Sequence, residues 1–123
     1  MKHFYLTRVF SAALLAGLFV TTSVSAQQKE VNETLRAVKM VKEKLGLRTA
    51  LGVSNVSFGL PLRPIVNRTF FTLAMECGLD LPIINPNDED MMASMYAFNV
   101  LKNSDVNAAA YIERYADRQI ASI

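Results

Sequence analysis

The sequence predicts an α/β fold in which short parallel strands alternate with helices. Two apolar, strand-like runs, residues 49–55 (TALGVSN) and residues 81–86 (LPIINP), flank an amphipathic helical segment. A strand, a helix and a second strand in that order form a βαβ unit, whose two strands run parallel in one sheet. The chain has 123 residues, of which 51% are hydrophobic, and this content is typical of a folded core rather than of a disordered segment.

The first half of the chain gives the clearest pattern. A helix is predicted over residues 31–45, because apolar residues recur there at spacings of three and four, and Gly46 is expected to end it. The run from Thr49 to Asn55 then has the composition of a short buried strand. Residues 58–64 contain a glycine and two prolines, so they are predicted to form a loop.

The second half continues the alternation. Asn67 is expected to cap a helix that stops at Gly78, and residues 81–86 then form the next strand. Asp88 can cap a further helix, and Ser104 or Asp105 starts a terminal one. With a weak strand placed before residue 31, the order is strand, helix, strand, helix, strand, helix, helix. The predicted inner face of the helix after Asp88 consists of Met92, Met95, Tyr96 and Val100.

Charge and cysteine content exclude several classes of function. The formal charge of +2 comes entirely from Lys2 and Arg8, so the chain from Gln27 onward is neutral and has no electrostatic footprint for nucleic acid. The single cysteine, Cys77, excludes an internal disulfide and a zinc site built from several cysteines. Its position beside a glycine at a helix end favours a core thiol over a nucleophile.

Three segments carry a resemblance to a known family: residues 52–61 (GVSNVSFGLP), residues 67–70 (NRTF) and residues 74–86 (AMECGLDLPIINP). They resemble the pterin-binding methyltransferases, and in particular the methyltetrahydrofolate-binding module of cobalamin-dependent methionine synthase. The resemblance implies a partial TIM-type (β/α) barrel with about three parallel strands, strands 6 to 8 of the family's barrel, flanked by helices. A complete TIM barrel has about 250 residues. The barrel is therefore expected to stay open, with two sheet edges able to pair with another chain.

The resemblance also implies roles for individual residues. It places Asn55 where the family has the asparagine that hydrogen-bonds N5 of the pterin, and a carboxamide suits this task because it both donates and accepts. Arg63 matches an arginine near the folate, whose guanidinium can hold carboxylate oxygens. Ile83 and Asn85 match positions that form the family's wall against the flat pterin ring. Ser54 is a further substrate-binding candidate for which two interpretations stay open: its backbone lines the pocket, or its side chain points to the opposite face, because neighbours on a strand alternate. Three structural alternatives stay open: an Asx turn at Asn55, a solvated Arg63 and core packing at Ile83.

The function implied by the resemblance is methyl transfer in methionine biosynthesis. In the intact enzyme, the substrate methyltetrahydrofolate gives its methyl group to the cobalt of cobalamin, which a separate module binds. The family's pterin site also uses aspartates and a second asparagine from earlier strands, which this chain lacks. We therefore expect a fragment of a cytoplasmic methyltransferase that is inactive or nearly so alone, binds no metal and has no membrane span. Its expected partners are the rest of the barrel, the corrinoid-binding module or, through the open sheet edges, a second copy.

The start of the chain supports a competing interpretation. Residues 1–26 combine a basic beginning, an apolar run over residues 9–20 and a small-residue sequence that fits a cleavage site, which is the pattern of a secretory signal peptide. If that signal is genuine, residues 27–123 are a small exported α/β protein with a binding or structural role. Otherwise residues 1–21 are a spurious N-terminal helix, and residues 22–123 are the C-terminal part of a pterin-binding barrel domain.

Overall fold

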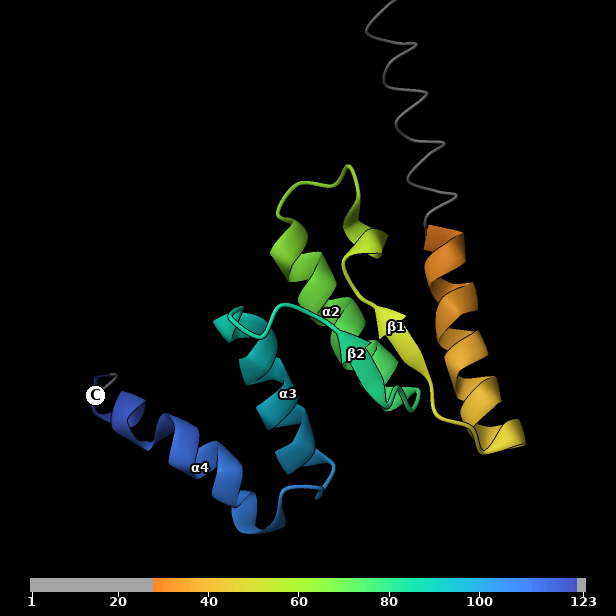
Figure 1. The fold of residues 1–123 in the computed structure, drawn as a ribbon. Coiled ribbons are helices and arrows are strands. Elements are labelled where there is room, and N and C mark those ends of the chain that lie inside the picture. Colours follow the sequence, from red (N-terminus) through yellow and green to blue (C-terminus); the bar gives the residue numbers. More distant parts are fainter. Residues whose placement is uncertain (1–27, 122–123) are drawn as a thin grey trace, which may run out of the picture.

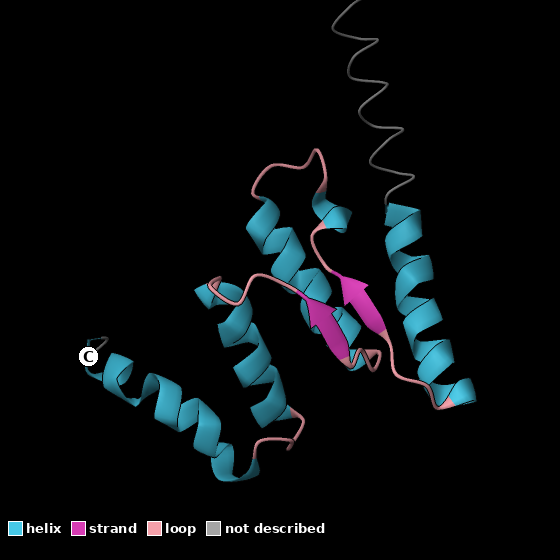
Figure 2. Cartoon of the chain, viewed as in Figure 1, coloured by secondary structure: helices cyan, strands magenta, loops and turns pink. Residues whose placement is uncertain are grey.

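The computed structural model describes residues 28–121, which form a two-stranded parallel sheet and a set of helices (Figure 1). Strand β1 is Ala50–Gly52 and strand β2 is Leu81–Ile83. They pair in parallel, with Ala50 opposite Leu81 and Gly52 opposite Ile83. Figure 2 shows the two arrows side by side and pointing the same way. This pairing confirms the predicted βαβ unit.

The remaining elements follow the predicted alternation of strands and helices. A helix over residues 28–40 is continued by a π-helical turn, and Gly46, with a φ of 64°, ends it as predicted. The predicted strand before residue 31 lies outside the described residues. The open sheet is compatible with a partial α/β barrel. The other elements in chain order are η1 (Val41–Leu45), η2 (Asn55–Ser57), α2 (Arg63–Glu76), α3 (Glu89–Leu101), η3 (Val106–Ala108), α4 (Ala109–Tyr115) and η4 (Ala116–Ala121).

The predicted start of α2 is wrong. The helix begins at Arg63 and not after Asn67, because Leu62 takes a left-handed conformation (φ 51°) that ends the loop. Pro64 can then occupy the first turn, where its missing N–H leaves no helical hydrogen bond unmade. Asn67 consequently lies inside the helix, and its buried Oδ1 has no hydrogen-bond partner among the described residues.

Helix α3 starts as predicted but presents a different inner face. The Asp88 carboxylate accepts a hydrogen bond from the Met91 N–H at 3.0 Å, which confirms Asp88 as the N-cap. Met91 is the buried residue of the helix, at 4% exposure, while Met92 is only half-buried. Met95, one helical turn after Met91, also packs against the core. The predicted stripe was therefore correct in Met95 and wrong in beginning at Met92.

The core covers one face of the sheet. Val53, Phe70, Phe71 and Met91 form its main buried cluster. A second buried cluster joins the first helix to α2. Its residues are Val38, Ala74 and Leu79, with Cys77 packed against them half-buried. Leu51 of β1 packs against this core, as do Val53 and Ile84, which directly follow β1 and β2.

The other face of the sheet is bare in the part of the chain that the structure describes. Leu81 is 56% exposed and Ile83 is 70% exposed, although both are large apolar residues. Side chains alternate between the two faces of a strand, so these residues point away from the helices that cover Ile84. Core packing, the structural alternative for Ile83, is therefore not observed. None of the described helices is long and apolar enough to cross a membrane.

Candidate functional site

The candidate residues gather where the two strands end. Because β1 and β2 are parallel and Gly52 lies opposite Ile83, the two strands finish side by side at the same end of the sheet. Ser54 and Asn55 follow β1, and Asn85 follows β2. We call this region, with Arg63 at the nearby start of α2, the carboxyl edge. In open parallel α/β sheets, ligands bind in the crevice outside the carboxyl ends of the strands.

Asn55 is the first residue of the 3₁₀ turn η2, and it is exposed. The sequence predicted it at the end of a strand, but β1 stops at Gly52 and the chain turns at once. Asn55 lines a hollow of about 210 Å³ between the first helix and the end of β1. Small-molecule pockets usually have about 300–1,000 Å³. This hollow is therefore too small to enclose a drug-sized ligand by itself. Its other lining residues are Glu30, Val31, Thr34, Leu51, Gly52, Val56 and Phe70.

Arg63 binds the turn that carries Asn55. Its Nε donates to Ser57 Oγ and its Nη2 donates to the Ser54 carbonyl oxygen, each at 3.0 Å. Ser57 Oγ in turn donates to the same Ser54 carbonyl at 3.2 Å. Ser57 is fully buried, so these bonds satisfy a hydroxyl that water does not reach. We call this set the Arg63–Ser57 clamp.

Sequence reasoning missed Ser57. Asparagine and serine are both common turn residues, so a serine two positions after a candidate asparagine carries no local signal of a special role. Its burial depends on the packing of η2 against α2, which only the folded chain provides.

Ile83 and Asn85 lie on the neighbouring strand and the loop after it. Ile83 ends β2 on the bare face, opposite Gly52. Asn85 is exposed, and its Oδ1 accepts a hydrogen bond from the Asn87 N–H at 3.1 Å, which forms an Asx turn. The structure thus bonds the Ser54 carbonyl directly to Arg63, and it places Ile83 at the end of the adjacent strand and Asn85 in the loop that follows.

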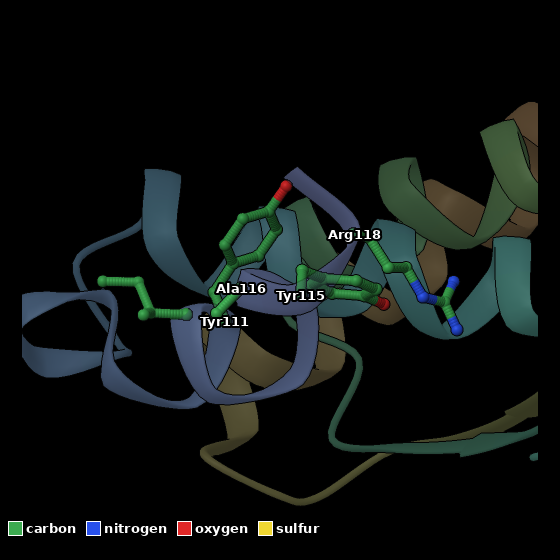
Figure 3. A pocket seen from close by; sticks show the side chains of 5 residues that line it. Tyr111, Tyr115, Ala116 and Arg118 are labelled. Atoms are coloured by element: carbon green, nitrogen blue, oxygen red, sulfur yellow. The ribbon is translucent and has the colours of Figure 1, made fainter. Parts of the chain in front are cut away.

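A second hollow, of about 390 Å³, lies at the C-terminal helices and contains none of the candidate residues (Figure 3). Arg114 and Arg118 in these helices pair with Glu89 at 3.2 and 3.3 Å. Both guanidinium groups also lie over the ring of Tyr115, at 5.9 and 5.5 Å from its centroid. These contacts tie α4 and η4 to the first turn of α3, and we assign them a structural role. The hollow is lined by Tyr111, Ile112, Tyr115, Ala116 and Arg118.

No family model matches the chain. Comparison with known proteins nevertheless finds relatives among methyltransferases. Over 72 residues the chain is 35% identical to the methylcorrinoid:tetrahydrofolate methyltransferase of Eubacterium limosum. Over 69 residues it is 33% identical to the methionine synthase of Mycobacterium leprae (strain TN). The chain is a relative of the methyltetrahydrofolate-binding methyltransferases.

This relationship confirms the resemblance to methyltetrahydrofolate-binding methyltransferases. The two matches cover 58% and 54% of this chain, but 27% and 6% of the relatives. The chain therefore corresponds to a small part of each relative. Within residues 28–121, no group of three or more His, Cys, Asp and Glu side chains is arranged to hold a metal ion.

Proposed function

We propose that the carboxyl edge forms one wall of a methyltetrahydrofolate site in a methyltransferase of the methionine synthase type. The observation that carries the proposal is the parallel register of β1 and β2, which brings Asn55 and Asn85 to one edge of the sheet. The relatives support the choice of ligand, because one of them is named for methyl transfer between a methylcorrinoid and tetrahydrofolate. Ser54, Arg63 and Ile83 border the same wall.

In this proposal, Asn55 acts on N5 of the pterin. When the methyl group leaves, the N5–carbon bond breaks, its electron pair stays on N5 and a proton must balance it there. A carboxamide can donate to the unprotonated nitrogen and accept from the protonated one, so it can serve both states. Its contribution is largest where charge develops in the transition state. A corrinoid, bound by another module, would supply the cobalt that accepts the methyl group.

The other walls of the site would come from further polypeptide. The 210 Å³ hollow beside Asn55 and the bare face with Leu81 and Ile83 both leave a bound pterin open to solvent. Positioning accounts for much of the rate of a transfer between two bound partners, so one wall alone would give little catalysis. We therefore place the rest of a barrel against the bare face and a corrinoid-binding module at the carboxyl edge, and expect the isolated chain to be inactive or nearly so.

A chimera tests the proposal. Residues 28–121 of this chain would replace the corresponding segment of the Eubacterium limosum relative, and circular dichroism would establish that the product is folded. We expect measurable methyl transfer from methyltetrahydrofolate to cob(I)alamin, measured as the change in cobalamin absorbance. A folded chimera that binds no methyltetrahydrofolate in calorimetric titration would contradict the proposal.

The isolated chain provides the matched measurement. Calorimetric titration with methyltetrahydrofolate should show no binding in the micromolar range, because only one wall is present. Micromolar binding to the isolated chain would show that the further walls are not required.

A further inference from the structure

Arg63 occupies a position that is electrostatically unfavourable for a cation. It is the first residue of α2, and the N-terminus of a helix carries a partial positive charge. A basic side chain is therefore disfavoured there unless other contacts offset the repulsion. The first turn of α2 contains no acidic residue to do so.

The contacts that offset it all lie in the turn around Asn55. The guanidinium reaches back across the loop that, in Figure 1, arches from η2 to the start of α2. Nε and Nη2 each make one 3.0 Å hydrogen bond, to Ser57 Oγ and to the Ser54 carbonyl. The planar guanidinium holds its two N–H donors at a fixed angle, so it fixes the orientation of the turn as well as its distance. The single ammonium group of a lysine would fix only the distance.

This geometry restrains Asn55 from both sides. Ser54 precedes it and Ser57 closes the turn after it, and both are bonded to the same guanidinium. The Asn55 carbonyl also accepts a hydrogen bond from the Phe58 N–H at 3.3 Å. An exposed turn of this kind is usually among the more mobile parts of a fold, so the clamp supplies a rigidity that the turn would otherwise lack.

We propose that Arg63 is a positioning residue, which acts with Ser57 to set the orientation of the Asn55 carboxamide. The inference rests on the proposed function of the carboxyl edge, and it gives Arg63 a role through the turn rather than through contact with folate. Ser57 is fully buried and cannot reach a ligand, so any effect of Ser57 on the site must pass through the clamp.

Nuclear magnetic resonance on the full 123-residue chain tests the clamp directly. Ser57→Ala removes the hydroxyl from the Arg63–Ser57 clamp. Arg63→Lys keeps the positive charge but removes the pair of guanidinium donors. We expect either change to shift and mobilise the Asn55 carboxamide signals and to speed hydrogen exchange of the Phe58 amide by about tenfold or more. The double variant should differ little from either single one, because the clamp acts as a unit.

Arg68→Lys is the matched control. Arg68 lies on the same helix, and its guanidinium pairs with the exposed Asp90 at 2.7 Å rather than with η2. It should leave the Asn55 and Phe58 signals unchanged. If folded Ser57→Ala and Arg63→Lys chains also retain the wild-type Asn55 signals, the clamp does not position Asn55 and the inference is wrong.

Kinetics in the chimera separate positioning from ligand contact. Both clamp variants should lower kcat about tenfold with little change in KM, and neither should lower it further in an Asn55→Ala background. If Arg63 instead touches the folate, Arg63→Lys will raise KM and Ser57→Ala will not. The resonance experiment uses no folate, so it decides the clamp even if the chimera shows that the proposed methyl transfer is wrong.

Discussion

The two ends of the same short sheet are built differently. At the amino edge, where the strands begin, the Asp80 carboxylate accepts a hydrogen bond from the Thr49 N–H at 3.0 Å and pairs with Lys42. At the carboxyl edge, Asn55 and Asn85 remain exposed after the strands end. At the amino edge the bonds cross from one strand to the other, from the residue before β2 to the residue before β1. At the carboxyl edge the side-chain bonds named above stay within the segment that follows each strand, as the Asx turn at Asn85 and the Arg63–Ser57 clamp show. In parallel barrels, polar residues at the carboxyl ends of strands serve chemistry, and those at the amino ends serve stability.

The largest expected effect tests the carboxyl edge. Asn55→Ala in the chimera should lower kcat on the order of 100-fold or more, because the carboxamide would stabilise N5 as its proton arrives. The free energy of unfolding should change by less than about 1 kcal/mol, since Asn55 is exposed. Stopped-flow absorbance of cobalamin and urea unfolding measure the two quantities.

Asn32→Ala is a suitable control for this variant, because it removes an exposed carboxamide from the first helix. It should alter neither quantity appreciably. The opposite pattern for Asn55→Ala, with about 1 kcal/mol of stability lost and turnover nearly normal, would make Asn55 only a turn residue.

The bare face of the sheet gives the second test. Ile83 is 70% exposed in this chain but would be covered in a complete barrel. Ile83→Ala should therefore cost less than about 1 kcal/mol in the isolated chain and about 2 kcal/mol or more in the chimera. Urea unfolding of both proteins measures the difference.

Val53→Ala is the control for that comparison. Val53 is fully buried against the helices, so its truncation should destabilise the chain and the chimera alike. Equal, small effects of Ile83→Ala in both proteins would show that no further wall covers the bare face.

The order of the described helices and strands and their parallel arrangement were predictable from the sequence, because hydrophobic periodicity and helix-ending glycines depend on local structure. The strand at 81–86 and the N-cap at Asp88 depend on residues close in sequence, and both were predicted, although β2 is shorter than the predicted run. Helix phase was harder to predict. The choice between Met91 and Met92 depends on where the neighbouring α2 lies, which local spacing does not specify.

The candidate site was predictable only in part. Asn55 and Asn85 stand beside strand ends, so their shared edge follows from a parallel sheet. The Arg63–Ser57 clamp does not follow from local pattern. It requires the left-handed backbone of Leu62, where most side chains are disfavoured, and this conformation turns the chain so that α2 starts at Arg63. The sequence, with Asn67 as the expected cap, left Arg63 in the loop.

The smallest expected effect tests the amino edge through Asp80. Asp80→Asn keeps an oxygen that can accept from the Thr49 N–H but removes the charge that pairs with Lys42. In the chimera, methyl transfer by the folded variant should stay near normal, which is the reverse of the Asn55→Ala pattern. At pH 7 the urea midpoint of the isolated chain should fall modestly, because partly exposed ion pairs contribute little.

The pH dependence of this effect has a definite sign. Hydrogen bonds from Lys42 and from the Thr49 N–H hold the pKa of Asp80 below its usual value of 3.8. The ionised carboxylate therefore contributes stability above about pH 3.8, and the contribution is lost as the pH falls toward the lowered folded-state pKa. The difference in urea midpoint between wild type and Asp80→Asn should thus be fully present at pH 7 and shrink below pH 3.8.

Glu43→Gln, which breaks an exposed pair with Lys39 on the neighbouring helix, should barely move the midpoint at either pH. If Glu43→Gln moves the midpoint as much as Asp80→Asn does, the contacts of Asp80 with Thr49 and Lys42 stabilise the chain no more than an exposed ion pair. The contrast between the two ends of the sheet would then be wrong.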